Sequence, residues 1–169
     1  LGNLAVSNLG RIKAEKITES MHDFAKKIQP FLAEAQENKA LECQVSGVRV
    51  LGELQQAYSH PDSGEPILLS YRVGQIKAVQ LLEAWLKLLF VNLAGERSIQ
   101  RAYCYGLNEK GLEGIVLTCP AADVVQAQWQ QALQWYWRCW QEPIAHLPED
   151  LWKVLTGFQK IDEKTTGGK

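Results

Sequence analysis

The segment from Ile76 to Leu93 constrains the fold of this chain more than any other. Its apolar residues follow helical spacing and cover far more than one stripe of the helix: Leu81, Leu82, Trp85, Leu86, Leu88, Leu89 and Leu93. So broad an apolar surface predicts a helix that is buried on most sides. Four polar residues interrupt the run: Gln80, Glu83, Lys87 and Asn92. No apolar stretch is long enough to cross a bilayer, so we expect a globular domain without a membrane contact.

Extended segments are expected on both sides of this helix. They cover residues 41–45, 48–58, 67–73, 98–105 and 114–119. The first three are separated by a turn signal at Ser46-Gly47 and by a loop rich in turn formers at 60–66, which predicts a three-stranded antiparallel meander. The last two are joined by a turn-rich stretch at 106–111.

Further helices are expected toward the two ends. One covers 17–36, where Pro30 should bend or divide it near Gln29. Its core stripe is Ile17, Met21, Phe24, Ile28, Leu32 and Ala35. The other follows Pro120, and its core stripe is Val125, Trp129, Leu133 or Ala132, Tyr136 and Trp140. A short helix at 149–155 is expected to pack back on the domain.

The resulting order is α-β-β-β-α-β-β-α-α, which predicts a mixed α/β (α+β) fold with a mixed central sheet flanked by helices. Its first six elements have the order of restriction-endonuclease-like cores. With 169 residues the chain is about one domain long. We place this domain at 17–158, after an N-terminal extension at 1–16 without an assigned role and before a flexible tail at 159–169. The chain begins at Leu1 rather than Met, so we expect it to be a piece of a longer protein.

Composition excludes several kinds of site. A net charge of −1 provides no general field for gathering nucleic acid, so a DNA contact would need a local patch. The four cysteines form no CxxC pair and the histidines are isolated, which argues against a metal site and a catalytic triad. Reduced thiols in a cytoplasmic protein are the simplest interpretation. No phosphate-binding glycine motif is present, so no ATP site or other cofactor is expected.

The extended segments 52–58 and 68–74 have the layout of a nuclease hairpin but lack its carboxylates. In metal-dependent nucleases of the restriction-endonuclease type, one strand ends near an Asp and the next carries Asp/Glu-x-Lys, because Mg²⁺ requires hard oxygen ligands. Here those positions are Gln55, Ser70 and Arg72. Ser70 and Arg72 share a strand face, but a hydroxyl and a guanidinium cannot hold a dication. Glu53 shares a face with Gln55 and offers a displaced ligand, although an exposed strand carboxylate is more often only solvated.

Two further residues have a functional and a structural interpretation. Arg72 is either a phosphate contact left at the position of a catalytic lysine or, as we favour, a partner for a carboxylate such as Glu53. The aromatic residues near the C-terminus are dense: Trp129, Trp135, Tyr136, Trp137, Trp140 and Trp152. Most are expected in the core because of their helical spacing. Trp135 lies off the stripe, which makes it a candidate for a partner interface.

Residues 41–155 resemble the C-terminal domain of the gamma subunit of bacterial exodeoxyribonuclease V, the RecC family. The matching stretches are VSGVRVLGELQQAY, LLSYRVGQIKAVQLLEAWLKLLFVNLAGE and LQWYWRCWQEPIAHLPEDLW. The resemblance implies a domain folded like the nuclease domain of the beta subunit that has lost its catalytic residues, in agreement with Gln55, Ser70 and Arg72. Active relatives carry a Gln followed four residues later by Tyr, whereas here Gln80 is followed by Ala84.

The resemblance also implies a role. The family belongs to a three-subunit, ATP-dependent helicase–nuclease that processes double-strand ends for recombination. The implied partners are the beta and alpha subunits and a double-stranded DNA end or fork. Two alternatives stay open: an active metal-dependent exonuclease with a relocated carboxylate, and an unrelated α+β protein-interaction module.

Overall fold

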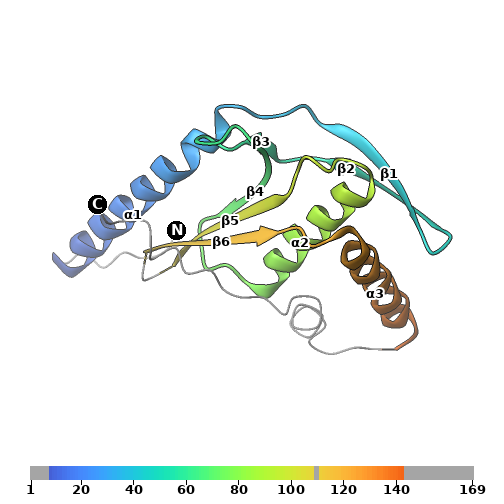
Figure 1. The fold of residues 1–169 in the computed structure, drawn as a ribbon. Helices are drawn as coiled ribbons and strands as arrows, with labels where there is room; N and C mark the ends of the chain where they lie inside the picture. Colours follow the sequence, from blue (N-terminus) through green and yellow to red (C-terminus); the bar gives the residue numbers. More distant parts are fainter. Residues whose placement is uncertain (1–7, 109–110, 143–169) are drawn as a thin grey trace.

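The mixed α/β class expected from the sequence is confirmed by a computed structural model, which describes residues 8–108 and 111–142 (Figure 1). In chain order the elements are α1 (Asn8–Leu32), β1 (Lys39–Val45), β2 (Val48–Leu54), β3 (Ala57–Ser59), β4 (Pro66–Arg72), α2 (Ala78–Leu93), β5 (Arg101–Asn108), β6 (Gly111–Thr118) and α3 (Ala122–Gln141). The helix expected at 149–155 lies outside the described residues. None of the described helices combines the length and the apolar character needed to cross a membrane.

The strands form two separate sheets. One is a four-stranded mixed sheet of order β3-β4-β5-β6, in which β4 and β5 are parallel and the other pairs are antiparallel. The other is the antiparallel hairpin of β1 and β2. The single meander predicted for the first three extended segments is therefore wrong. The run 48–58 divides at Gln56, whose φ of 60° is left-handed, so β3 leaves the hairpin and pairs with β4 instead.

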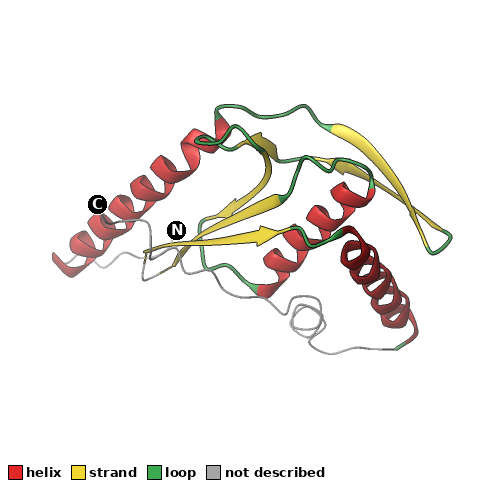
Figure 2. Cartoon of the chain, viewed as in Figure 1, coloured by secondary structure: helices red, strands yellow, loops and turns green. Residues whose placement is uncertain are grey.

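Helices cover both faces of the four-stranded sheet (Figure 2). Successive residues of β4 alternate between the two faces, as strand geometry requires. Ile67 and Leu69 belong to a core cluster with α1, which also contains Phe24, Ile28, Phe31, Tyr103 and Tyr105. Leu68 belongs to the larger cluster on the other face, built around α2. The sheet therefore separates two apolar layers.

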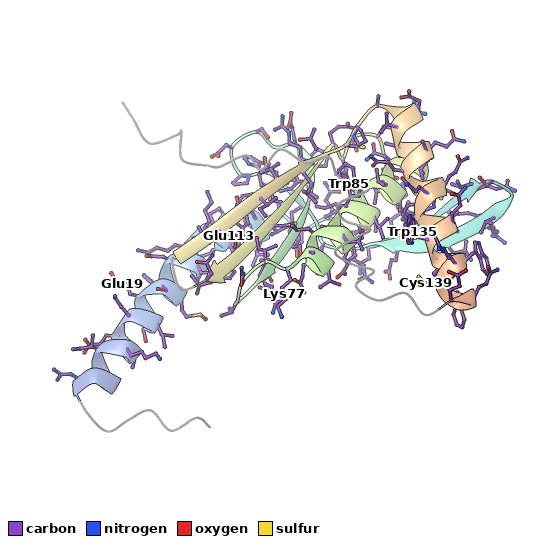
Figure 3. All side chains as sticks on the ribbon, turned by 90° about the horizontal axis from the view of Figure 1, so that it is seen from below. Glu19, Lys77, Trp85, Glu113, Trp135 and Cys139 are labelled. Atoms are coloured by element: carbon purple, nitrogen blue, oxygen red, sulfur yellow. The ribbon has the colours of Figure 1, made fainter. Side chains whose placement is uncertain are left out.

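The helix α2 is buried on most sides, as its sequence predicts. Leu88 and Leu89 are fully buried, and Trp85 is only 3% exposed. The indole Nε1 of Trp85 donates to Oε1 of Gln128 at 3.2 Å, which joins α2 to α3; Figure 3 shows Trp85 on the α2 ribbon in the interior of the domain. The β1–β2 hairpin also packs against α2, since four of its apolar residues belong to the same core cluster: Leu41, Cys43, Val45 and Leu54.

The helix α1 is longer than predicted and buried over less of its length. It begins at Asn8, within the predicted extension, and Pro30 lies in its last turn without dividing it. Phe24 and Ile28 are buried as expected. The other four residues of the predicted stripe are exposed, namely Ile17, Met21, Leu32 and Ala35, and Phe31 is buried in their place. The N-terminal half of the helix, which carries Glu19, extends past the sheet, so no described element covers it (Figure 3).

The helix α3 follows its predicted core stripe only at first. Val125 is buried, and Trp129 and Leu133 pack against the larger core cluster. Tyr136 and Trp140, predicted to lie in the core, are 52% and 73% exposed. In its last two turns α3 is half-buried on one side, at Trp135 and Cys139, whereas Tyr136, Trp137 and Trp140 are exposed on a side that no described element covers (Figure 1).

Candidate functional site

Ser70 and Arg72, two of the positions compared with a nuclease site in the sequence, lie at one edge of the four-stranded sheet. Ser70 and Arg72 lie at the carboxyl end of β4, on the face that carries α2. Because β4 and β5 are parallel, with Ser70 opposite Cys104 and Arg72 opposite Gly106, the carboxyl ends of both strands meet there. Gln55 lies between β2 and β3. Two neighbouring hollows open at this edge, and Ser70 lines both.

The smaller hollow brings Gln55 and Ser70 together with α2. Its volume of about 20 Å³ has room for roughly one water molecule. Glu83 and Lys87 of α2 line it and form an ion pair of 2.9 Å. The Lys87 ammonium also donates to Oε1 of Gln56 at 3.3 Å. Glu83 is thus a carboxylate at this edge that the sequence analysis noted only as a polar interruption of a helix.

The predicted pairing of Arg72 with Glu53 is not found in the described part of the chain. The Glu53 carboxylate instead accepts a hydrogen bond of 2.6 Å from Nε2 of its neighbour Gln55. The Nε atom of Arg72 is buried and has no hydrogen-bond partner among the described residues. Arg72 therefore brings a desolvated donor to this edge of the sheet rather than completing a surface ion pair.

The larger hollow has a volume of about 250 Å³ and adjoins Arg72. It is lined by Ser70, Tyr71, Arg72, Val73, Ile76, Gln80, Cys104 and Tyr105. Burial, with a contribution from the charge of Glu83, raises the pKa of the Cys104 thiol to about 12, so this lining group is neutral. Among the described residues that line it, the charged group is a guanidinium and none is a carboxylate. The hollow consequently offers hydrogen-bond donors rather than ligands for a cation.

Nowhere in residues 8–108 and 111–142 do three or more His, Cys, Asp or Glu side chains gather in a way that could hold a metal ion. Glu83 is the carboxylate that lines the smaller hollow, and it is already paired with Lys87. Magnesium in nuclease sites is usually held by one or two carboxylates together with substrate phosphate. Among the described residues, the smaller hollow at this edge thus presents one carboxylate, and that carboxylate is paired.

The aromatic residues of α3 are arranged differently from expectation. Trp135, the candidate for a partner contact, is half-buried and packs against the larger core cluster, with the Arg138 guanidinium 5.6 Å from its ring centre. Tyr136, Trp137 and Trp140 form an exposed group with edge-to-face ring contacts of 5.4 and 6.1 Å. Helical spacing did not predict the exposure of these side chains, because a core stripe continues to the end of a helix only if other elements cover the helix along its whole length. Trp152 lies outside the described residues.

Comparisons with known proteins identify the family. The family model described as the RecC C-terminal domain matches residues 1–159. No curated protein sequence matches the chain. Among solved structures, one titled "Crystal structure of SSO0001" is similar over 69% of this chain and 57% of that chain, with 11% sequence identity and a TM-score of 0.40. The present chain thus corresponds to little more than half of that structure. The match over residues 1–159 confirms the resemblance inferred from the sequence, and the chain belongs to the RecC C-terminal domain family.

Proposed function

We propose that this chain is a non-catalytic, nuclease-like domain of the gamma subunit of exodeoxyribonuclease V, an ATP-dependent helicase–nuclease that acts in double-strand-break repair by recombination. In that complex it contacts the beta and alpha subunits and the forked DNA. The observation that carries the proposal is the type of residue found at two strand positions. Ser70 and Arg72 occupy the strand positions at which a related nuclease requires an acid and a lysine, and their side chains line the hollows at that edge.

The geometry gives little support to the alternative of an exonuclease with a relocated carboxylate. Glu83 lines the same hollow as Ser70, but Lys87 neutralises it. Glu53 is exposed, hydrogen-bonded to Gln55 and absent from the lining of both hollows. A metal-dependent hydrolase holds its ion through carboxylates together with the substrate phosphate. One carboxylate that is already paired with a lysine is a poor ligand set for this purpose.

Exposed apolar side chains support the proposed contacts with other subunits. They lie on the N-terminal half of α1, at Ile12, Ile17 and Met21, and at the end of α3, at Tyr136, Trp137 and Trp140. Clustered aromatic and aliphatic groups on a surface are typical of protein interfaces. Two such surfaces on opposite sides of one domain suit a scaffold between neighbours (Figure 1).

Size-exclusion chromatography of this chain with purified beta and alpha subunits, with and without a forked duplex, tests the proposal. We expect co-elution with at least one subunit and no release of nucleotides from labelled DNA in Mg²⁺ or Mn²⁺. Nuclease activity of the chain alone that Glu83→Gln abolishes would establish the exonuclease alternative. A folded chain that elutes alone in every mixture would favour the unrelated interaction module.

A further inference from the structure

We propose that the larger hollow, between the carboxyl end of β4 and the start of α2, binds a phosphate group of a DNA strand. The inference deepens the proposed function, since it rests on a DNA contact by this domain, and it assigns that contact to a defined site. It depends on the donors that line the hollow, on how firmly they are held and on the size of the space.

Arg72 brings an unpaired, buried donor to the hollow. Its Nε atom is buried, and none of the described residues accepts a hydrogen bond from it. A buried donor on a charged group is unfavourable unless it is paired. Arg72 also lines the hollow, so an anion there would meet its guanidinium group and offset the charge of which Nε is the buried part. Guanidinium groups are well suited to this, because they can donate two parallel hydrogen bonds to phosphate oxygens.

Other groups that line the hollow can also donate hydrogen bonds. Oε1 of Gln80 accepts a hydrogen bond of 2.9 Å from the backbone N–H of Lys77, which leaves the amide nitrogen of Gln80 available as a donor. Ser70 contributes a hydroxyl, and none of the described residues that line the hollow carries a carboxylate. Lys77 lies exposed at the start of α2 (Figure 3), where the helix dipole also favours negative charge.

The loop between β4 and α2, beside these groups, is held in place against β5. A Cβ atom at Gly106 would lie 2.8 Å from the carbonyl oxygen of Gly74 and 2.6 Å from Cγ1 of Ile76, so only glycine allows the loop to approach β5 this closely. The backbone N–H of Leu107 donates to that same carbonyl oxygen at 3.1 Å. Preorganised donors bind an anion with a smaller loss of conformational freedom.

The size and position of the hollow indicate what it binds. At about 250 Å³ it is smaller than the roughly 300–1,000 Å³ typical of pockets that enclose a whole small molecule. It therefore suits one phosphate group with its ester linkages better than an enclosed nucleotide. Its place beside the carboxyl ends of parallel strands is where ligands bind in open α/β sheets.

Titration of the ¹⁵N-labelled chain with inorganic phosphate, followed through the Arg72 side-chain Nε–H signal, tests the site directly. We expect a saturable shift of this signal, and loss of the accompanying backbone shifts at the hollow in Arg72→Gln. Arg49→Gln is the matched control, because Arg49 is an exposed arginine of the hairpin whose Nε pairs with Glu42 at 2.6 Å. An Arg72 signal that phosphate leaves unmoved would overturn the proposal.

Binding of a ten-residue thymidine oligonucleotide, with and without a 5′-phosphate, identifies the source of the phosphate. We expect Arg72→Gln to weaken binding at least fivefold and to reduce the salt dependence by about one phosphate contact, while Arg49→Gln changes neither. Equal affinity of both oligonucleotides assigns a backbone phosphate, and tighter binding of the phosphorylated one assigns a strand end.

Two further outcomes keep the test decisive. If Arg72→Gln fails to fold, Arg72→Lys and Ser70→Ala replace it, and unchanged oligonucleotide binding in both would overturn the site. Failure of the site is distinguishable from failure of the proposed function, because phosphate titration requires no other subunit. Co-elution with the beta and alpha subunits that persists in Arg72→Gln, together with an unmoved Arg72 signal, would refute the site alone.

Discussion

Cys104 and Cys119 make the folding stability of this domain sensitive to alkaline pH. Burial raises the pKa of Cys119 to about 11, and burial with the charge of Glu83 raises that of Cys104 to about 12. In the unfolded chain a thiol titrates near pH 8.5, so at higher pH the unfolded state loses protons that the folded state keeps. The stabilisation is complete below about pH 8.5 and declines as the pH rises toward the folded pKa values.

We therefore expect the free energy of unfolding in urea to fall between pH 8.5 and 10.5, by at most about 1.4 kcal/mol per pH unit for the buried Cys104 thiol and by less for the half-buried Cys119 thiol. Unfolding followed by tryptophan fluorescence at several pH values measures this decline. The Cys104→Ala/Cys119→Ala variant should show a shallower decline, because it lacks both thiols while Cys43, whose pKa burial also raises, still contributes. An equal slope in both proteins would contradict the assignment.

Leu88 is fully buried at the centre of α2, in the larger core cluster. Leu88→Ala should lower the free energy of unfolding by about 2–5 kcal/mol, because it removes apolar contacts and leaves a cavity. Val79→Ala, in the same helix at a side chain that is 46% exposed, should cost at most about 0.5 kcal/mol beyond its change in helix propensity. Chemical denaturation compares the two, and similar losses would mean that α2 is not the centre of the core.

The docking of the β1–β2 hairpin on α2 requires a close approach at Gly52. A Cβ atom there would lie 2.7 Å from a ring carbon of the buried Phe90, so the ring would have to move. Gly52→Ala should therefore destabilise the domain by about 1–3 kcal/mol. In a double-mutant cycle with Phe90→Leu, which shortens the opposing side chain, we expect the added cost of Gly52→Ala to fall by at least half. An additive cycle would show that the two residues do not interact.

The elements that were predicted well are those whose signal is local. The position and burial of α2 follow from its apolar periodicity, and the shared face of Ser70 and Arg72 follows from the period of two along a strand. The division of the run 48–58 was not predictable in this way, because Gln55-Gln56 carries no turn signal and the left-handed φ of Gln56 depends on pairing with β4.

The larger hollow was beyond sequence reasoning for a similar reason. Gln80 comes from α2, and Cys104 and Tyr105 come from β5. They meet Arg72 only because β4 and β5 pair in parallel with Ser70 opposite Cys104. The sequence predicted both strands, but neither their neighbourhood nor their relative direction. The sequence thus predicted that Ser70 and Arg72 share a strand face, but it did not predict the larger hollow that they line with residues of α2 and β5.

The domain as a whole has a well-packed centre and two apolar ends that no described element covers. The larger core cluster is built around α2 and contains residues of the four-stranded sheet, the hairpin and α3. Past this centre, the N-terminal half of α1 and the last turns of α3 extend from different sides (Figure 1). Side chains that are already exposed contribute little to folding, so their replacement separates effects on association from effects on stability.

The end of α3 provides the sharpest test of this separation. Trp137 and Trp140 are 53% and 73% exposed, so Trp137→Ser/Trp140→Ser should shift the melting temperature by only a few degrees. Tryptophan is enriched among the residues that dominate binding energy, so the same variant should lose most of its co-elution with the beta and alpha subunits. The control is Val79→Ser/Leu112→Ser, which removes two apolar side chains that are 46% and 41% exposed at other sites. If both variants bind like the parent chain, the end of α3 is not an interface; if both lose binding equally, the loss reflects general surface apolarity rather than a defined contact.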